Sequence, residues 1–183
     1  IKAPYVLINN FDGVQQGMKH LINKGFSRIA FVTVDIKLIQ VEERLRGYVT
    51  ALKTHKLPVK KKYILQLQYH RQREDSLREL QSFIEANPEL DAIFFSTNYL
   101  GILGLEVLAR LGLRMPQDIS VICFDDHDIF RLYPPGISVI EQPIEGIAKT
   151  AIDLLMHQLD KNSGPMRKSN IELPGRFILR GSA

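Results

Sequence analysis

Short apolar runs rich in β-branched residues alternate with longer amphipathic stretches along almost the whole chain. Most of the apolar runs lack an internal polar alternation, which is typical of strands that are covered on both faces. Parallel strands need a long crossover between them, and a helix usually provides it. The rhythm therefore predicts an α/β fold built on a parallel sheet, with strands over residues 5–8, 28–34, 63–67, 92–96, 119–124 and 137–140.

The intervening stretches carry apolar residues at helical spacing. One stripe runs through Leu100, Leu103, Val107 and Leu111 and is closed by Gly112, a common residue just past a helix end. The last stretch, residues 171–180, departs from the rhythm because Pro174 lies in its middle. We expect it to form an edge strand, where a missing backbone donor is tolerated.

Composition narrows the possible classes of protein. Hydrophobic residues make up 45% and charged residues 24% of 183, as in ordinary globular proteins. The single cysteine, Cys123, excludes a disulfide framework and makes a cysteine-based metal site improbable. No apolar stretch reaches the roughly 18 to 20 residues that a membrane helix needs, and the first residues lack a signal-peptide layout. We expect a cytoplasmic protein with no membrane partner.

The formal net charge of +4 does not by itself indicate nucleic-acid binding. The lysines and arginines are scattered along the chain. The only run of them, the three lysines at residues 60–62, suits a solvated connection between elements better than a DNA-binding stripe. No zinc-finger spacing, basic heptad region or RNA-binding aromatic pattern is present.

Polar residues follow several predicted strands, at the sheet edge where ligands bind in open α/β folds. They are Asp35, residues 96–98, Asp125 with Asp126, and Glu141 with Gln142, and Arg44 begins the helix after Asp35. Carboxylates accept hydrogen bonds from hydroxyls, an arginine donates, and amides do both. This set suits a hydroxyl-rich small molecule.

An enzymatic interpretation has little support. Adjacent residues at a strand end point to opposite sides, so Asp125 and Asp126 do not suit a proton-sharing dyad, and a capping role is the simpler expectation for Asp126. His127 is the only histidine near the predicted cleft, and no nucleotide-binding or acyl-transfer motif is present. Two features stay open: Tyr69 suits sugar stacking or a cover over the strand end, and residues 132–136 suit a dimer contact or a simple turn.

Six segments occur in a characteristic order: KHLINKGFSRIAFV (19–32), ERLRGYVTAL (43–52), DAIFFSTN (91–98), LGLRMPQDISVICFDD (111–126), PPGISVIEQP (134–143) and the final FILRGSA. Together they resemble the lactose-repressor (LacI/GalR) family of bacterial transcription regulators. The resemblance covers essentially the whole chain.

The resemblance implies a type I periplasmic-binding-protein-like fold with two Rossmann-like lobes of parallel sheet. Residues 1–24 and 142–161 would form a partial N-terminal lobe, and residues 25–141 and 166–183 the C-terminal lobe. The family's DNA-binding helix-turn-helix would be absent from this chain. The family normally has more residues between Ile8 and Asn10, which suggests the hypothesis that the sequence joins two segments there.

The resemblance also assigns roles to individual residues. It implies effector binding by Phe11, Asp12, Arg44, Tyr69, Asn98, Asp125 and Gln142. It places Leu103, Val107, Phe130, Leu132 and Tyr133 near a homodimer interface.

The function implied is the effector-binding and dimerisation domain of a regulator that senses a small sugar-like molecule and alters operator binding. The partners implied are that effector, operator DNA through a separate N-terminal domain, and a second subunit, with no enzyme activity, metal or cofactor. A periplasmic sugar-binding protein of a transporter is the alternative, and a sugar-acting enzyme on the same scaffold is a third.

Overall fold

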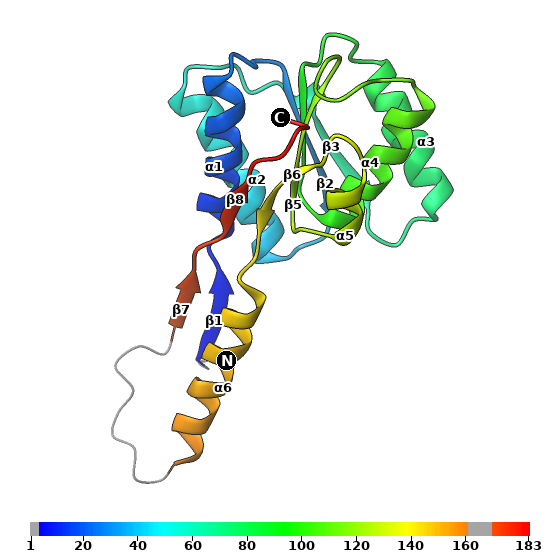
Figure 1. Cartoon of the computed structure of the whole chain (residues 1–183). Coiled ribbons are helices and arrows are strands. Elements are labelled where there is room, and N and C mark those ends of the chain that lie inside the picture. Colours follow the sequence, from blue (N-terminus) through cyan, green and yellow to red (C-terminus); the bar gives the residue numbers. More distant parts are fainter. Residues whose placement is uncertain (1–3, 161–169) are drawn as a thin grey trace.

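The computed structural model describes residues 4–160 and 170–183, in which strands and helices alternate as predicted (Figure 1). The strands are β1 (Tyr5–Ile8), β2 (Ile29–Asp35), β3 (Ile64–Gln68), β4 (Ala92–Phe95), β5 (Ser120–Phe124), β6 (Ser138–Glu141), β7 (Asn170–Leu173) and β8 (Arg176–Ile178). The helices are α1 (Asn10–Asn23), α2 (Ile39–Thr54), α3 (Arg73–Glu85), α4 (Asn98–Arg110), α5 (Asp128–Leu132) and α6 (Ile144–Leu159), with a 3-10 turn at Lys61–Tyr63.

A six-stranded sheet with the order β3-β2-β4-β5-β6-β8 forms the centre of the body. Strands β2 to β6 are parallel, and β8 pairs antiparallel with β6 at one edge. The predicted parallel strands are confirmed, with ends that differ by at most one residue. The α/β class predicted from the alternating pattern is therefore confirmed.

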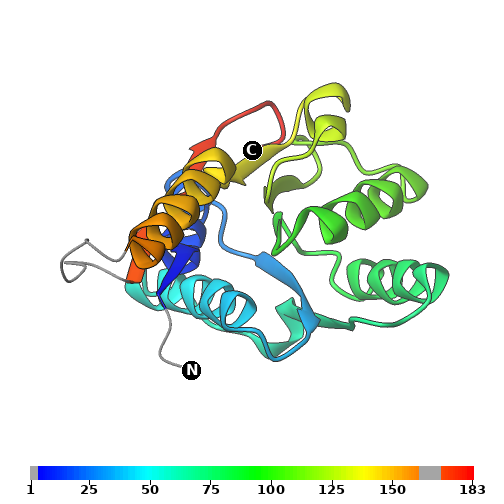
Figure 2. The same ribbon diagram turned by 90° about the horizontal axis from the view of Figure 1, so that it is seen from below.

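Helices cover both faces of this sheet, so that two cores lie on either side of it (Figure 2). The face packed by α1 and α2 buries Phe31 and Phe94, and the opposite face, packed by α3, α4 and α5, buries Phe95. Helix α4 lies very close to the sheet because Gly104 faces the Phe95 ring. A Cβ at position 104 would come within 2.1 Å of that ring.

The last segment forms two strands in two sheets, and the prediction of one edge strand over 171–180 is wrong. Strand β7 pairs parallel with β1 in a separate two-stranded sheet, whereas β8 joins the main sheet. Pro174 and Gly175 separate them. A side chain at Gly175 would meet Ile8 and Ile140, so the chain can cross here only with a glycine or with local rearrangement.

Strands β1 and β7 and helix α6 form an arm that projects from the body (Figure 1). The chain passes between arm and body at Asn9, at residues 142–143 and at residues 174–175. Helix α6 leaves several apolar side chains exposed: Ile144, Ile152, Leu155, Met156 and Leu159.

Helix α1 packs with the body, although the predicted division grouped residues 1–24 with 142–161. Its apolar face, which includes Val14, Met18 and Leu21, is fully buried in the core shared with α2 and the main sheet. Asn9 alone connects β1 to α1, and its side chain accepts a hydrogen bond from the Asp12 N–H. The hypothesis of a missing segment at this position stays a prediction.

Among residues 4–160 and 170–183, no helix is both long and apolar enough to cross a membrane.

Candidate functional site

The strand order of the main sheet reverses between β2 and β4. The chain moves outward from β2 to β3 on one side and from β4 through β6 on the other. Connections leave in opposite directions at such a switch point, which opens a crevice beyond the carboxyl ends of the two central strands. The site therefore lies where β2 and β4 end, at Asp35 and Phe95.

Arg44 lies at the centre of this crevice and is only 5% exposed. Its Nε donates to Asn10 Oδ1 at 2.8 Å, and its Nη1 donates to the Ser96 carbonyl at 2.6 Å and to Asp125 Oδ2 at 3.2 Å. The guanidinium also lies 3.7 Å from the centroid of the Phe124 ring. Arg44 thereby joins α2, α1 and the ends of β4 and β5.

Burial and ion pairing shift the pKa of Arg44 in opposite directions. Burial lowers the pKa of the guanidinium, and the neighbouring Asp125 carboxylate partly offsets this by raising it. A buried cation of this kind needs its hydrogen-bond partners, because an unpaired charge away from water is costly. The cluster therefore fixes the orientation of Arg44 before any ligand arrives.

Asp125 is the second centre of the site. It has a left-handed backbone conformation, with φ of +71°, and its N–H donates to the Ile140 carbonyl at 2.9 Å. Its carboxylate accepts hydrogen bonds from Arg44 and from Gln142 Nε2. Gln142 begins the connection from β6 to α6, so the Asp125 carboxylate links the sheet to one of the crossings between body and arm.

A pocket of about 380 Å³ adjoins this cluster. Residues of β1, α2, the start of α4 and the crossing to α6 line it: Val6, Leu7, Ile8, Leu38, Gln40, Val41, Arg44, Thr97, Gln142 and Ile147. The Gln40 Oε1 atom is buried and accepts no hydrogen bond from the residues described. Apolar walls with a few polar groups directed inward are typical of a small-molecule site.

The structure brings three of the predicted effector-binding residues together, namely Arg44, Asp125 and Gln142. Asn98 is the first residue of α4, directly after Thr97, which lines the pocket.

The other three predicted residues lie outside the pocket. Phe11 lies under the Arg46 guanidinium at 4.1 Å, and Asp12 exchanges hydrogen bonds with Asn9 at the start of α1. Tyr69 is 53% exposed, with its ring against His70. These three positions stay predictions for binding.

Sequence reasoning missed Asn10 and Gln40. The position of Asn10 beside the capping residue Asn9 gave no signal that Asn10 belongs to the site. Asn10 is 5% exposed, and its side chain accepts a hydrogen bond from Arg44 and donates one to the Ile8 carbonyl. Gln40 precedes Arg44 by four residues, so both lie on one face of α2. That spacing was the available signal for Gln40.

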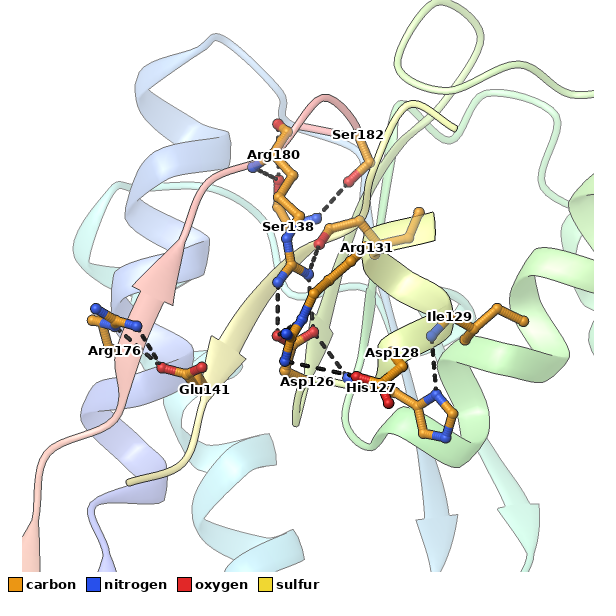
Figure 3. A network of polar contacts seen from close by, with 11 residues as sticks. Asp126, His127, Asp128, Ile129, Arg131, Ser138, Glu141, Arg176, Arg180 and Ser182 are labelled. Atoms are coloured by element: carbon orange, nitrogen blue, oxygen red, sulfur yellow. Dashed lines mark hydrogen bonds and ion pairs between the residues drawn. The ribbon is translucent and has the colours of Figure 1, made fainter. Parts of the chain in front are cut away.

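Asp125 and Asp126 have different partners, as expected for adjacent residues at a strand end, so the two carboxylates do not form a dyad. Figure 3 shows the partners of Asp126. Arg180 donates to both Asp126 oxygens, at 2.9 and 2.7 Å, and Arg131 donates at 3.4 Å. The Asp126 carboxylate also accepts the His127 N–H, but the residue that caps α5 is His127, whose Nδ1 accepts the Ile129 N–H, so the capping role expected for Asp126 is not observed.

Three of the residues predicted near a homodimer interface have side chains that face the core, and their place near an interface stays a prediction. Leu103, Val107 and Phe130 are buried in the core against the main sheet, because α4 and α5 turn these side chains inward. Leu132 is 79% exposed, and Tyr133 is partly buried beside a groove between α3, α4 and α5.

No group of three or more histidine, cysteine or acidic side chains that could hold a metal ion occurs among the residues described.

These features define a class: an open α/β domain with a ligand pocket between a body and a second unit joined to it by several crossings. The chain belongs to the family described as periplasmic binding protein-like domain, whose profile matches residues 18–183.

Relatives of the chain are transcription regulators. It is 27% identical over 159 residues to the ribose operon repressor of Haemophilus influenzae, covering 87% of this chain and 47% of that protein. It is 25% identical over 175 residues to the HTH-type transcriptional repressor PurR of the same organism, covering 95% and 52%. The chain thus spans about half the length of these curated relatives.

A solved structure extends the similarity to the fold. The crystal structure of a regulatory protein of the LacI family from Chloroflexus aggregans is 26% identical and superposes with a TM-score of 0.88, covering 100% of this chain and 64% of that one. The resemblance to the lactose-repressor family is confirmed, together with the periplasmic-binding-protein-like fold that it implied.

Proposed function

We propose that this chain is the effector-binding part of a LacI-family transcription regulator that senses a small sugar-like molecule and thereby alters operator binding. The observation that carries the proposal is the Arg44–Asp125–Gln142 cluster beside the pocket at the switch point. Relatives that are repressors, one of them of a ribose operon, favour this function over a binding protein of a transporter or an enzyme.

The chemistry of the pocket supports a ligand with several hydroxyl groups. The Arg44 guanidinium donates, the Asp125 carboxylate accepts from hydroxyls, and the Gln142 amide can do both. Gln40 Oε1 offers a further buried acceptor without a partner among the residues described, which a ligand hydroxyl would satisfy. No cofactor is needed for recognition of this kind.

The arm and the body provide the two sides of the pocket. Val6, Leu7 and Ile147 come from the arm, and Arg44 and Thr97 come from the body. A ligand that bridges both sides would favour one arrangement of the two units over another, which is the differential affinity that allosteric control requires.

The remaining parts of the proposal follow the relatives. The regulator would act in the cytoplasm as a homodimer and bind DNA through a segment outside the present sequence. The face with Leu132 and Ile129 exposed is the part of the body that suits a subunit contact.

Sugar titration of site variants tests this function. We expect D-ribose, a hexose or a disaccharide to bind the wild-type chain in isothermal titration calorimetry. Arg44→Ala and Asp125→Ala should each weaken that binding at least about tenfold, because a charged hydrogen bond to the ligand is lost.

The matched control is Asp118→Ala, which removes an exposed carboxylate paired with Arg114 and should leave the affinity unchanged. Circular dichroism checks that each variant is folded. Unchanged affinity in both site variants would contradict the site assignment.

A further inference from the structure

The Asp126 carboxylate joins parts of the chain that are far apart in sequence (Figure 3). It follows β5 and binds Arg180 of the C-terminal segment as well as Arg131 of α5. The Asp126 side chain is 8% exposed and that of Arg180 16%, so little water competes for the pair. Two parallel hydrogen bonds between a guanidinium and a carboxylate also fix their relative orientation.

Arg180 is itself held on several sides. Its Nη1 donates to the Ile137 carbonyl at 2.8 Å, and its backbone N–H donates to Ser138 Oγ at 2.9 Å. Two residues further on, Ser182 Oγ donates to the Val121 carbonyl and accepts the Ser138 N–H. The segment therefore provides a rigid anchor for Asp126 between β5 and β6.

Asp125 lies next to this anchor and has a left-handed backbone conformation. Aspartate adopts this conformation more readily than most residues, so hydrogen bonds on both sides help to hold Asp125 in one orientation. On one side, the Asp125 N–H is bound to the Ile140 carbonyl. On the other side, the next residue is Asp126, whose side chain is fixed by Arg180.

We propose that Asp126 and Arg180 are positioning residues, and that their ion pair holds the Asp125 carboxylate in the orientation that meets Arg44 and Gln142. Neither residue touches the pocket, and both act through Asp125. The proposal deepens the proposed function and rests on it for the role of the pocket. The geometry that it concerns exists without a ligand.

The side-chain Nε–H of Arg44 gives a readout of this geometry in the absence of ligand. Its NMR resonance can be assigned through its disappearance in Arg44→Lys, and its exchange with water can be timed. In Asp126→Asn we expect the resonance to shift and its exchange to accelerate at least about tenfold, because the charge that binds Arg180 is gone. Arg180→Lys, which keeps the charge but not the paired geometry, should give an intermediate effect.

Ser182→Ala is the matched control. It loosens the same segment by removing the hydrogen bonds to Val121 and Ser138 but leaves the Asp126–Arg180 pair in place. We expect it to lower the free energy of unfolding and to leave the Arg44 resonance unchanged. An equal change in Ser182→Ala would show a general loosening of the sheet and would overturn the proposal, as would an unchanged resonance in both Asp126→Asn and Arg180→Lys.

A D-ribose titration followed on the same resonance separates this proposal from the proposed function. The same titration is repeated with the hexose and the disaccharide. If none of these sugars changes the wild-type spectrum, the proposed ligand class is wrong, while the exchange rates measured without ligand still decide the role of Asp126.

Discussion

Two consecutive carboxylates, Asp125 and Asp126, have different surroundings because the chain turns between them. Asp125 lies beside the pocket and binds Arg44 and Gln142, whereas Asp126 binds Arg180 and Arg131 on the other side of β5. Each has an arginine partner with little exposed area, 6% for Arg44 and 16% for Arg180. Removing one member of such a pair leaves a poorly solvated charge, so these positions are sensitive to substitution.

The Asp126 pair predicts a dependence of stability on pH. Burial raises the pKa of the Asp126 carboxyl, but its hydrogen bonds with Arg180 and His127 and the charges of Arg180 and Arg131 outweigh this and hold the pKa below its ordinary value. A lowered pKa in the folded state means that the stabilisation is complete above the unfolded-state value near 3.9 and is lost as the pH falls through the folded-state value.

We expect Asp126→Asn to lower the free energy of unfolding by about 2 kcal/mol at pH 7, with the deficit shrinking as the pH falls below about 3.9. Urea unfolding at a series of pH values measures this. Asp153→Asn, at an exposed position of α6, serves as a comparison with little expected change at neutral pH. A deficit that does not depend on pH would show that the ionised carboxylate is not its source.

At the scale of elements, the sequence pattern predicted those features that depend on residues close together in the sequence. The parallel strands were predicted to within a residue at each end, because buried strands are continuous apolar runs bounded by polar residues. The division of the last segment into β7 and β8 was missed, because the two halves pair with β1 and β6, which are distant in sequence. Pairing over such distances leaves no periodic signal.

The same distinction applies to the candidate site. Asp125 and Gln142 were predictable because strand ends in a parallel sheet meet at one edge, and Arg44 because it lies in the helix that follows β2. The positions of Phe11 and Tyr69 relative to the pocket were not, since proximity to a strand end does not fix the direction of a side chain. The contact of Arg44 with Asn10 depends on how α1 docks against α2, which the sequence pattern does not specify.

Two glycines within helices test how closely the elements pack. A Cβ at Gly104 would lie 2.1 Å from the Phe95 ring, whereas a Cβ at Gly146 of α6 would meet its neighbours at ordinary distances of 3.5 and 3.7 Å. We expect Gly104→Ala to lower the free energy of unfolding by about 1 to 3 kcal/mol through overpacking. Gly146→Ala should be neutral or raise it by up to about 1 kcal/mol through helix propensity.

Chemical denaturation of the two variants side by side measures both effects. Equal effects of the two substitutions would contradict the close contact between α4 and β4.

At the scale of the whole molecule, the main feature is the difference in packing between the body and the arm. The body encloses two cores around one sheet, whereas the arm consists of a two-stranded sheet and one helix. Helix α6 buries Leu154 and leaves Ile144, Ile152, Leu155, Met156 and Leu159 more than half exposed. A contiguous apolar surface of this kind promotes nonspecific association in water.

We expect the chain as given to bind the dye ANS and to have limited solubility. Replacing Ile152, Leu155 and Met156 together with glutamine should reduce ANS fluorescence several-fold and raise the concentration at which the protein precipitates. The control is a triple glutamine variant of exposed lysines at positions 60–62, which carries the same number of substitutions on the body. Equal dye binding by the two variants and the wild type would show that α6 is not the source.

The three crossings between body and arm also determine how one unit can move against the other. They lie together: a Cβ at Gly175 would be 3.2 Å from Ile8 and 3.4 Å from the Glu141 carbonyl, and the Asn9 N–H donates to the Leu173 carbonyl. A unit held by a single linker can twist, swing and translate. Three linkers side by side resist twisting and separation more than bending, so bending is the motion that would open or narrow the space between Arg44 and Ile147. A ligand that fills this space would then set the angle between the two units.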